Sequence, residues 1–270
     1  MEKTIKKRNI AFKVLDNHRI EGYCPNGFFT DCIQNGDWEE ETFIILEKYA
    51  TTNKVYIDVG AWIGPTVLFA AQLYENVVCF EPDPIALLTL EYNLLINDFE
   101  HVILEKKALA GHVGTIKFGG NWEMGNSEST LLVNDATFLS KYDVEGQRGT
   151  YKSRTENSIE VPSITIEKVM DTHAIDPKTI ALIKMDIEGG EYIVLPAMKD
   201  FLQTNQPNFY LSLHFVYLLD FQVDEILAIL FQIYNRCYTI IDGKELEMTK
   251  IEIMQEKIEH LVFENTIEHP

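Results

Sequence analysis

The segment from Lys54 to Pro84 constrains the fold of the chain more than any other. Two short apolar runs, Val55–Val59 and Val77–Phe80, are typical of buried strands. Between them lie a turn with two glycines and a stretch, Thr66–Leu73, for which we expect a helix. The second run is followed directly by an acid. This order of strand, glycine turn, helix, strand and acid predicts half of an open α/β nucleotide-binding sheet, with its ligand at the carboxyl ends of the strands.

The turn between the two strands does not match a dinucleotide-binding loop. Such a loop needs G-x-G-x-x-G, whereas here Gly60 and Gly64 stand alone and Trp62 occupies the place of the middle glycine. A pyrophosphate would have poor access to the backbone, and Asp58 would repel it. Glu81 lies about 20 residues after the turn, where a carboxylate binds ribose hydroxyls. S-adenosylmethionine, which has a ribose, an ammonium group and no phosphate, fits these acids; the alternative is a doubly wound domain with an incidental turn.

The residues after the second strand extend this pattern. Asp83 is placed to cap a helix over Ile85–Ile96, with a proline as its first residue. A third strand is expected over Val102–Ala110. Lys107 and Ala108 fall near the end of that strand, where we expect backbone groups to contact an adenine.

A second informative segment begins with the apolar strand expected over Ala181–Ile187. Its end carries Lys184, Asp186 and Glu188, which the period of a strand places on one side. Two carboxylates and a lysine at a half-buried strand end are costly unless they are paired or used. They form either a structural ion pair that fixes the strand end or part of a catalytic site.

The next strand, expected over Asn208–Leu213, ends at His214. A lone histidine is more often a packed or surface residue than a catalyst. Here it stands at the carboxyl end of a strand that we expect beside the strand of Asp186. That position makes His214 a candidate catalytic residue.

Outside these segments the chain divides into a cap and a main domain. Turn signals in residues 1–36 predict short strands and turns, and a helix is expected over 38–48. We therefore assign a cap to residues 1–50 and the main domain to 51–270. Residues 119–157 are irregular and rich in glycine, asparagine, serine and glutamate, which favours a lid or acceptor loop, or else a disordered insertion.

Three further expectations concern the edges of these units. The first turn of the 38–48 helix holds acids that suit the helix dipole, although one of them could face the ligand: Glu39, Glu40 and Glu41. Gly111–Phe118 is expected to form a hairpin extension. Cys237–Ile241 and His260–Glu264, with no long helix between them, predict a terminal antiparallel hairpin on an otherwise parallel sheet.

The charge of the chain limits its partners. Its 23 basic and 42 acidic residues give a net charge of −19, which repels nucleic acid and anionic membranes. The 4 cysteines show no C-x-x-C spacing, so neither a cysteine metal site nor a disulfide framework is expected. No apolar run suits a signal peptide or the ~20 residues of a membrane helix. We expect a cytoplasmic protein with a small-molecule or carbohydrate acceptor as its partner, and the oligomeric state stays open.

Several motifs together resemble the FkbM family of S-adenosylmethionine-dependent methyltransferases. The resemblance runs from about Glu39 to His214, and it is specific because the motifs occur together in the right order. They are Y-I-D-V-G-A-W-I-G at 56–64, F-E-P-D-P at 80–84, K-A-L-A-G at 107–111, I-K-M-D-I-E-G-G-E at 183–191 and L-S-L-H at 211–214.

The resemblance implies a class I methyltransferase fold, a Rossmann-like, mostly parallel sheet of seven strands with a reversed last strand and helices on both faces. It implies O-methyl transfer to a hydroxyl of a sugar, glycan or small natural product. The residues expected to contact the cofactor are Asp58, Gly60, Ala61, Trp62, Gly64, Glu81, Pro82, Asp83, Lys107, Ala108 and Asp186. The chain departs from the family at Trp62, where asparagine is frequent, and at Glu128 between Ser127 and Ser129.

A hydroxyl becomes a good nucleophile only when its proton leaves, so a base assists the transfer. We predict that Asp186 orients the imidazole of His214 while the imidazole accepts the proton, with Glu188 as the third candidate. A divalent cation held by Asp186 and Glu188 is the lesser alternative, because hard oxygen ligands suit magnesium but no third acidic ligand is evident. No metal site is therefore predicted.

Two other classes of protein remain open on the sequence. One is a nicotinamide-dependent oxidoreductase on a similar sheet, which the missing middle glycine disfavours. The other is a nucleotide-binding module without catalysis, which the presence of Asp58, Glu81 and the 183–191 segment disfavours.

Overall fold

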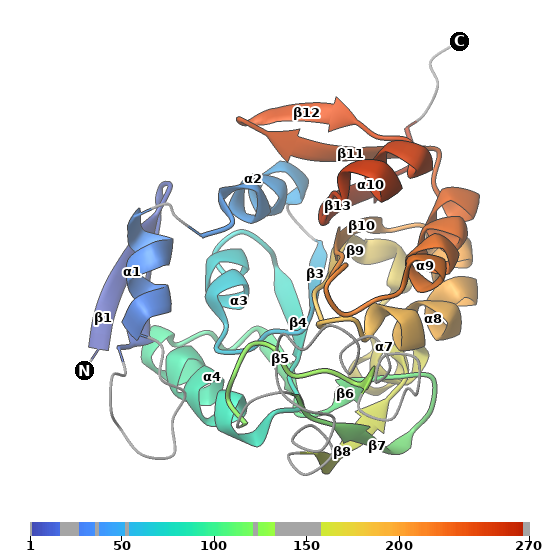
Figure 1. Cartoon of the computed structure of the whole chain (residues 1–270). Helices are drawn as coiled ribbons and strands as arrows, with labels where there is room; N and C mark the ends of the chain where they lie inside the picture. Colours follow the sequence, from blue (N-terminus) through green and yellow to red (C-terminus); the bar gives the residue numbers. More distant parts are fainter. Residues whose placement is uncertain are drawn as a thin grey trace, which may run out of the picture.

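The computed structural model describes residues 2–16, 27–35, 38–51, 54–120, 124–132 and 158–266. Its centre is a mixed sheet of eight strands in the order β12-β11-β13-β10-β9-β3-β4-β5 (Figure 1). The strands are β3 (Val55–Val59), β4 (Asn76–Phe80), β5 (Val102–Glu105), β9 (Ile180–Met185), β10 (Asn208–Ser212), β11 (Arg236–Ile241), β12 (Lys244–Glu247) and β13 (His260–Glu264). Five adjacent strands, β10, β9, β3, β4 and β5, run parallel to one another, so their carboxyl ends meet at one edge of the sheet.

Helices cover both faces of this sheet (Figure 1). Alternate residues of one strand enter two different hydrophobic cores: Ile57 packs on one face and Tyr56 on the other. The first core includes α7 (Ile166–His173), α8 (Glu191–Asn205), α9 (Asp220–Ile233) and α10 (Lys250–Glu256). The second includes α2 (Glu40–Tyr49), α3 (Pro65–Ala70) and part of α4 (Pro84–Asn97). The α/β class is therefore confirmed.

The terminal part of the sheet differs from the prediction in one respect. The strands β11 and β13 pair antiparallel, as expected for the terminal hairpin, and β13 also runs antiparallel to β10. The sheet has eight strands where the prediction gave seven, because Lys244–Glu247 pairs with β11 as an additional edge strand. This short strand consists entirely of exposed residues, so it gives no apolar signal in the sequence.

A second sheet of three strands lies near the carboxyl ends of β4 and β5 (Figure 1). It consists of β6 (Ala108–Leu109), β8 (Ile159–Ile164) and β7 (Gly114–Phe118). The single strand predicted over Val102–Ala110 is thus wrong, because the two lysines at 106–107 interrupt it and the chain changes sheets there. The predicted hairpin extension is wrong as well, because β7 pairs with β8.

The N-terminal residues form a small unit beside α4 (Figure 1). It consists of the antiparallel strands β1 (Glu2–Lys7) and β2 (Ile10–Leu15), followed by α1 (Gly27–Asn35). Side chains of α4 bind the hairpin: Asn93 Oδ1 accepts from Leu15 N at 2.7 Å and Asn97 Oδ1 from Lys13 N at 2.8 Å. The short strands agree with the prediction, whereas α1 follows glycine and asparagine turn signals that predicted no helix.

Among the described helices, α8 is the longest at 15 residues, and none is long and apolar enough to cross a membrane.

Candidate functional site

The turn after β3 is built on a glycine that no other residue can replace without strain. Gly60 has φ +92°, and its N–H and that of Ala61 both donate to Phe80 O, at 3.2 and 3.0 Å. A Cβ at Gly60 would lie 1.9 Å from Asp186 O. The turn therefore joins the ends of β3, β4 and β9 in one place. Gly64, with φ +90°, faces Leu90 instead and starts α3.

Asp58 lies beneath this turn. It is fully buried and its Oδ2 accepts from Tyr56 Oη at 3.0 Å and from Thr66 Oγ1 at 2.5 Å. Its Oδ1 is 3.7 Å from Lys184 Nζ. Burial raises the pKa of Asp58, and the Lys184 ammonium opposes that rise. Asp58 does not line either cavity described below, so it supports the turn from behind.

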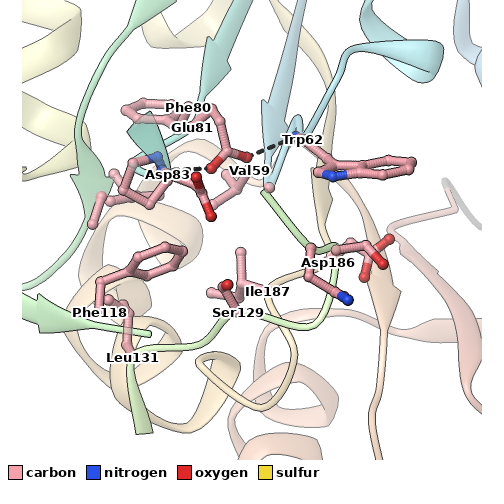
Figure 2. Close-up of a pocket in the computed structure, with 16 residues that line it drawn as sticks. Val59, Trp62, Phe80, Glu81, Asp83, Phe118, Ser129, Leu131, Asp186 and Ile187 are labelled. Carbon is pink, nitrogen blue, oxygen red and sulfur yellow. Dashed lines mark hydrogen bonds between the residues drawn. The ribbon is translucent and has the colours of Figure 1, made fainter. Parts of the chain in front are cut away.

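Glu81 follows β4 and both of its oxygens are held. Oε2 accepts from Trp62 N and Oε1 from Asp83 N, each at 2.7 Å (Figure 2). The side chain is 5% exposed, and burial raises its pKa to about 8 while the two backbone donors oppose the shift. The carboxylate is therefore fixed in orientation, with further lone pairs available to a ligand.

A cavity of about 540 Å³, open to solvent on one side, lies at these strand ends; we call it the Glu81 cavity. Figure 2 shows Phe118 and Leu131 opposite Glu81 and Asp83, with Trp62 and Asp186 toward one end. Its lining is Val59, Gly60, Trp62, Phe80, Glu81, Pro82, Asp83, Ala108, Leu109, Phe118, Asn126, Ser127, Ser129, Leu131, Asp186 and Ile187. Apolar walls with a few oriented polar groups are typical of a small-molecule site.

Gly125 ties the segment 124–132 to the strand ends. Its N–H donates to Asp83 Oδ2 at 2.7 Å, and its carbonyl accepts from Trp62 Nε1 at 3.0 Å. Asp83 Oδ1 meanwhile caps α4 by accepting from Ile85 N and Ala86 N, which confirms the predicted cap. Trp62 has φ +48°, a left-handed conformation that is uncommon for a bulky residue. The segment thus forms a fixed wall of the Glu81 cavity.

Replacing Asp83 with alanine is expected to lower the free energy of unfolding by about 2–3 kcal/mol, because it removes a helix cap and the carboxylate that accepts from the buried Gly125 N–H. Proteolysis within 124–132 should also accelerate. Thr249→Ala is the matched control, since it removes only the cap of α10 and should cost about 1 kcal/mol. Urea denaturation and limited proteolysis measure both; equal effects of the two variants would contradict the role of Asp83 in holding Gly125.

Lys184 and Asp186 stand at the end of β9, which stops at Met185, two residues earlier than predicted. Lys184 Nζ is buried and donates to Asp186 Oδ2 at 3.0 Å. Burial alone would lower the pKa of Lys184, but the nearby carboxylates of Asp186, Asp58 and Glu39 outweigh it and raise the pKa. Burial would likewise raise the pKa of Asp186, yet Lys184 and His214 hold it below its usual value. The two residues are an ion pair at neutral pH.

His214, just after β10, meets three carboxylates. Its Nε2 lies 3.4 Å from Asp186 Oδ1 and 3.5 Å from Glu188 Oε2, and its Nδ1 lies 3.5 Å from Glu191 Oε1. Burial alone would lower the pKa of His214, but these acids raise it to about 10. Burial, with Asp186 and Glu191, raises the pKa of Glu188 to about 8. Without ligand, the imidazole of His214 is therefore protonated on both nitrogens and positively charged at neutral pH.

A second cavity of about 550 Å³, including open solvent, surrounds this cluster; we call it the His214 cavity. Its lining is Trp38, Glu39, Gly60, Ala61, Trp62, Pro65, Thr66, Ser127, Lys184, Asp186, Glu188 and His214. Glu39 enters it from a left-handed backbone, φ +38°, just before α2, and burial raises the pKa of this carboxyl. Four residues line both cavities: Gly60, Trp62, Ser127 and Asp186.

The structure thus brings most of the predicted site residues together. Gly60, Trp62, Glu81, Pro82, Asp83, Ala108 and Asp186 line the Glu81 cavity, while Ala61, Glu188 and His214 line the other. Asp58 and Gly64 lie behind the lining, and the Lys107 ammonium turns to Glu105 at 2.6 Å. Of the predicted lid over 119–157, residues 121–123 and 133–157 lie outside the described residues, whereas Asn126 and Ser127 are cavity residues.

Several residues of the site had no individual prediction, among them Phe118, Leu131 and Glu191. Phe118, from β7, and Leu131, from the 124–132 segment, lie on the same side of the Glu81 cavity, opposite Glu81 and Asp83 (Figure 2). Only an apolar residue at each position signals them in the sequence. Glu191 lies 3.5 Å from His214 Nδ1. In the sequence it is indistinguishable from any acid that stabilises the first turn of a helix, here α8.

Comparison with known proteins adds an independent finding. The model of the methyltransferase FkbM domain matches residues 58–238, more than half of the chain. No curated protein matches the chain.

Solved structures of low sequence identity resemble the chain. The methyltransferase FkbM from Methylobacillus flagellatus KT is 18% identical with a TM-score of 0.46, over 79% of this chain and 44% of that one. The chain therefore spans less than half the length of that protein. An rRNA methylase from Streptococcus thermophilus is 12% identical, with a TM-score of 0.42 over 83% and 95% of the two chains. Precorrin-6y C5,15-methyltransferase from Geobacter metallireducens GS-15 is 10% identical, with a TM-score of 0.44 over 85% and 90%.

Proposed function

The chain belongs to the FkbM methyltransferase family, and on that premise we propose that it transfers the methyl group of S-adenosylmethionine to a hydroxyl of a small-molecule or carbohydrate acceptor. We take the seven strands other than β12 as the class I methyltransferase sheet, with β13 as its reversed strand. Residues 1–50 then form the cap and 51–270 the catalytic domain. The net charge of −19 speaks against nucleic acid as the acceptor.

The Glu81 cavity suits the adenosine part of the cofactor. Glu81 has a fixed carboxylate at the end of the second strand, where ribose hydroxyls bind in such sheets. Ala108, Leu109 and Phe118 give the apolar surface that an adenine needs. Among the described acids, Asp186 alone lines both cavities, and its carboxylate suits the ammonium group.

One observation carries the proposal: the two cavities share Gly60, Trp62, Ser127 and Asp186. A cofactor with its ribose at Glu81 would point its sulfonium toward this shared wall. An acceptor in the His214 cavity would then approach the methyl group from the other side. Transfer needs that approach to be in line, with oxygen about 3 Å from carbon and water excluded.

For this reaction the protein needs to position the cofactor and the acceptor and to accept the hydroxyl proton. A C–O bond forms as the C–S bond breaks, sulfur keeps the electron pair, and S-adenosylhomocysteine leaves. In this proposal the imidazole of His214 accepts the hydroxyl proton and Asp186, 3.4 Å away, orients it, with Glu188 as the third candidate. Without ligand, His214 is protonated and positively charged. The positive charges of the cofactor near Asp186 would lower the pKa of His214, so that the imidazole can lose this proton and act as a base.

Replacing Glu81 with alanine is expected to raise the Kd for S-adenosylhomocysteine about 10–100-fold, because the ribose hydroxyls lose the carboxyl group that accepts their hydrogen bonds. Turnover at saturating S-adenosylmethionine should fall less. Calorimetric titration measures the affinity, with Glu91→Ala as a control acid on α4 outside both cavities. An unchanged affinity in Glu81→Ala would remove the ribose role from this residue.

The cofactor itself is tested by titrating the purified chain with S-adenosylmethionine and, separately, with NADH. Saturable binding of the first alone supports the proposal. Binding of NADH alone would instead favour the oxidoreductase alternative on a similar sheet. Binding of neither by a folded protein would contradict cofactor use by this chain.

A further inference from the structure

Three side chains of the His214 cavity are spaced as ligands around a small cation. One oxygen each of Asp186 and Glu188 and a ring nitrogen of His214 lie within 4.8 Å of one another. The contacts of His214 Nε2, at 3.4 and 3.5 Å, exceed the ~2.7–3.2 Å of good hydrogen bonds. Ligand atoms ~2.1 Å from a cation are about 3.0 Å apart in octahedral and about 3.4 Å apart in tetrahedral geometry. Small side-chain movements would therefore close this shell on one ion.

The far side of the imidazole carries the partner that a metal-binding histidine normally has. Nδ1 lies 3.5 Å from Oε1 of Glu191, which is fully buried and also accepts from Ile187 N at 2.9 Å. Such a carboxylate fixes the proton on Nδ1 and turns the lone pair of Nε2 toward the metal. At 3.5 Å this contact is longer than a hydrogen bond, so among the described residues Nδ1 and Glu191 Oε2 have no hydrogen-bond partner, and closing the shell on an ion would have to shorten the contact. A cation placed between the Nε2 lone pair and the carboxylates of Asp186 and Glu188 would be stabilised by all three groups.

From this geometry we propose that Asp186, Glu188 and His214 bind one divalent cation, with Glu191 positioning the histidine. Two carboxylates and one imidazole suit Mn²⁺ or Zn²⁺ better than Ca²⁺, which prefers oxygen ligands alone. Only three protein ligands leave positions open toward the His214 cavity. The sequence shows no third acidic ligand beside Asp186 and Glu188, and in the structure His214 supplies the third ligand.

The role of the cation rests on the proposed function. With the cation bound, His214 would be a ligand and no longer the base, and an acceptor hydroxyl on an open position would lose its proton to solvent more readily because the cation stabilises the alkoxide. The alkoxide oxygen would then form the C–O bond as the C–S bond breaks, with the electron pair leaving on sulfur. The protein would thus both place and activate the oxygen.

The test is a titration of the full chain, stripped with a chelator and desalted, with Mn²⁺ followed by electron paramagnetic resonance. Saturable binding of one ion is expected in the wild type. Kd should rise at least about 10-fold in Glu188→Gln and in His214→Ala, and about 10–100-fold in Glu191→Gln. Glu41→Gln is the matched control, because Glu41 pairs with His260 at 3.6 Å outside this cluster and should leave the affinity unchanged.

Absence of saturable binding, or one Kd for all folded variants, would overturn the proposal. Circular dichroism shows which variants fold, and the three cluster variants provide independent readings. S-adenosylhomocysteine binding is measured on the same stripped protein. A protein that binds this nucleoside but no Mn²⁺ contradicts the cation site alone, whereas one that binds Mn²⁺ but no nucleoside contradicts the proposed function alone.

Discussion

Methyl transfer by His214→Ala is expected to be about 10²–10⁴-fold slower than by the wild type at saturating substrates, because the variant loses the group at the centre of the three carboxylates. The affinity for S-adenosylhomocysteine should change little, since His214 lines only the acceptor side of the shared wall. The measurement is release of S-adenosylhomocysteine with an acceptor found by screening sugars and small hydroxyl compounds.

His260→Ala is the control for this variant. His260 pairs with Glu41 and with Tyr210, so its loss removes a partly buried imidazole of similar size outside both cavities. Its turnover should stay within about twofold of the wild type. If His214→Ala keeps normal turnover but loses nucleoside binding, the residue belongs to the cofactor site and the catalytic role is wrong.

Gly60→Ala is expected to abolish nucleoside binding and to lower the free energy of unfolding by more than about 3 kcal/mol. The new methyl group would lie 1.9 Å from the backbone oxygen of Asp186, so β3 and β9 would have to separate at their carboxyl ends. A φ of +92° adds strain for any residue with a Cβ. Denaturation with urea and calorimetry with S-adenosylhomocysteine measure the two effects.

Gly243→Ala separates the two causes. Gly243 also has a positive φ, +72°, but nothing lies within 4 Å of its added Cβ. Its replacement should cost about 1 kcal/mol from backbone strain alone and leave binding intact. If Gly60→Ala costs no more than Gly243→Ala, the close approach to Asp186 does not constrain the site.

The parts of the site that the sequence predicts well are those at the ends of buried parallel strands. Val55–Val59 forms as expected, and Asp83 caps its helix. Asp186 and His214 meet because neighbouring parallel strands end at the same edge, which fixes where their next residues lie. In such places the local pattern and the tertiary arrangement carry the same information.

Prediction failed where the pairing partner of a strand decides the structure. The run Val102–Ala110 has the composition of one strand, yet β5 pairs with β4 and β6 pairs with β8. The edge strand β12 has no buried residue and so no alternation to detect. When the pairing partner of a strand is far away in the sequence, a short segment of the sequence does not show which strand it pairs with.

Two acids of the site have an adequate local explanation in the sequence, which hid the role of Glu191 and left Glu39 as only one of three acids that could face the ligand. Glu39 and Glu191 both stand at helix starts, where an acid is favourable without any ligand. The tertiary fold turns one toward the His214 cavity and the other toward the His214 ring. Lys107 was predicted as a site residue, but its ammonium pairs with the carboxylate of Glu105, two residues earlier in the chain.

The position of β13 governs the order in which the sheet is completed during synthesis. This strand lies between β10 and β11, which do not pair with each other. A growing chain that has passed β11 therefore presents two open strand edges with a gap one strand wide. His260–Glu264 fills that gap only after nearly all of the described sheet has been translated. Until then the exposed edges of β10 and β11 can pair with other nascent chains, so chaperone protection should matter most over this interval.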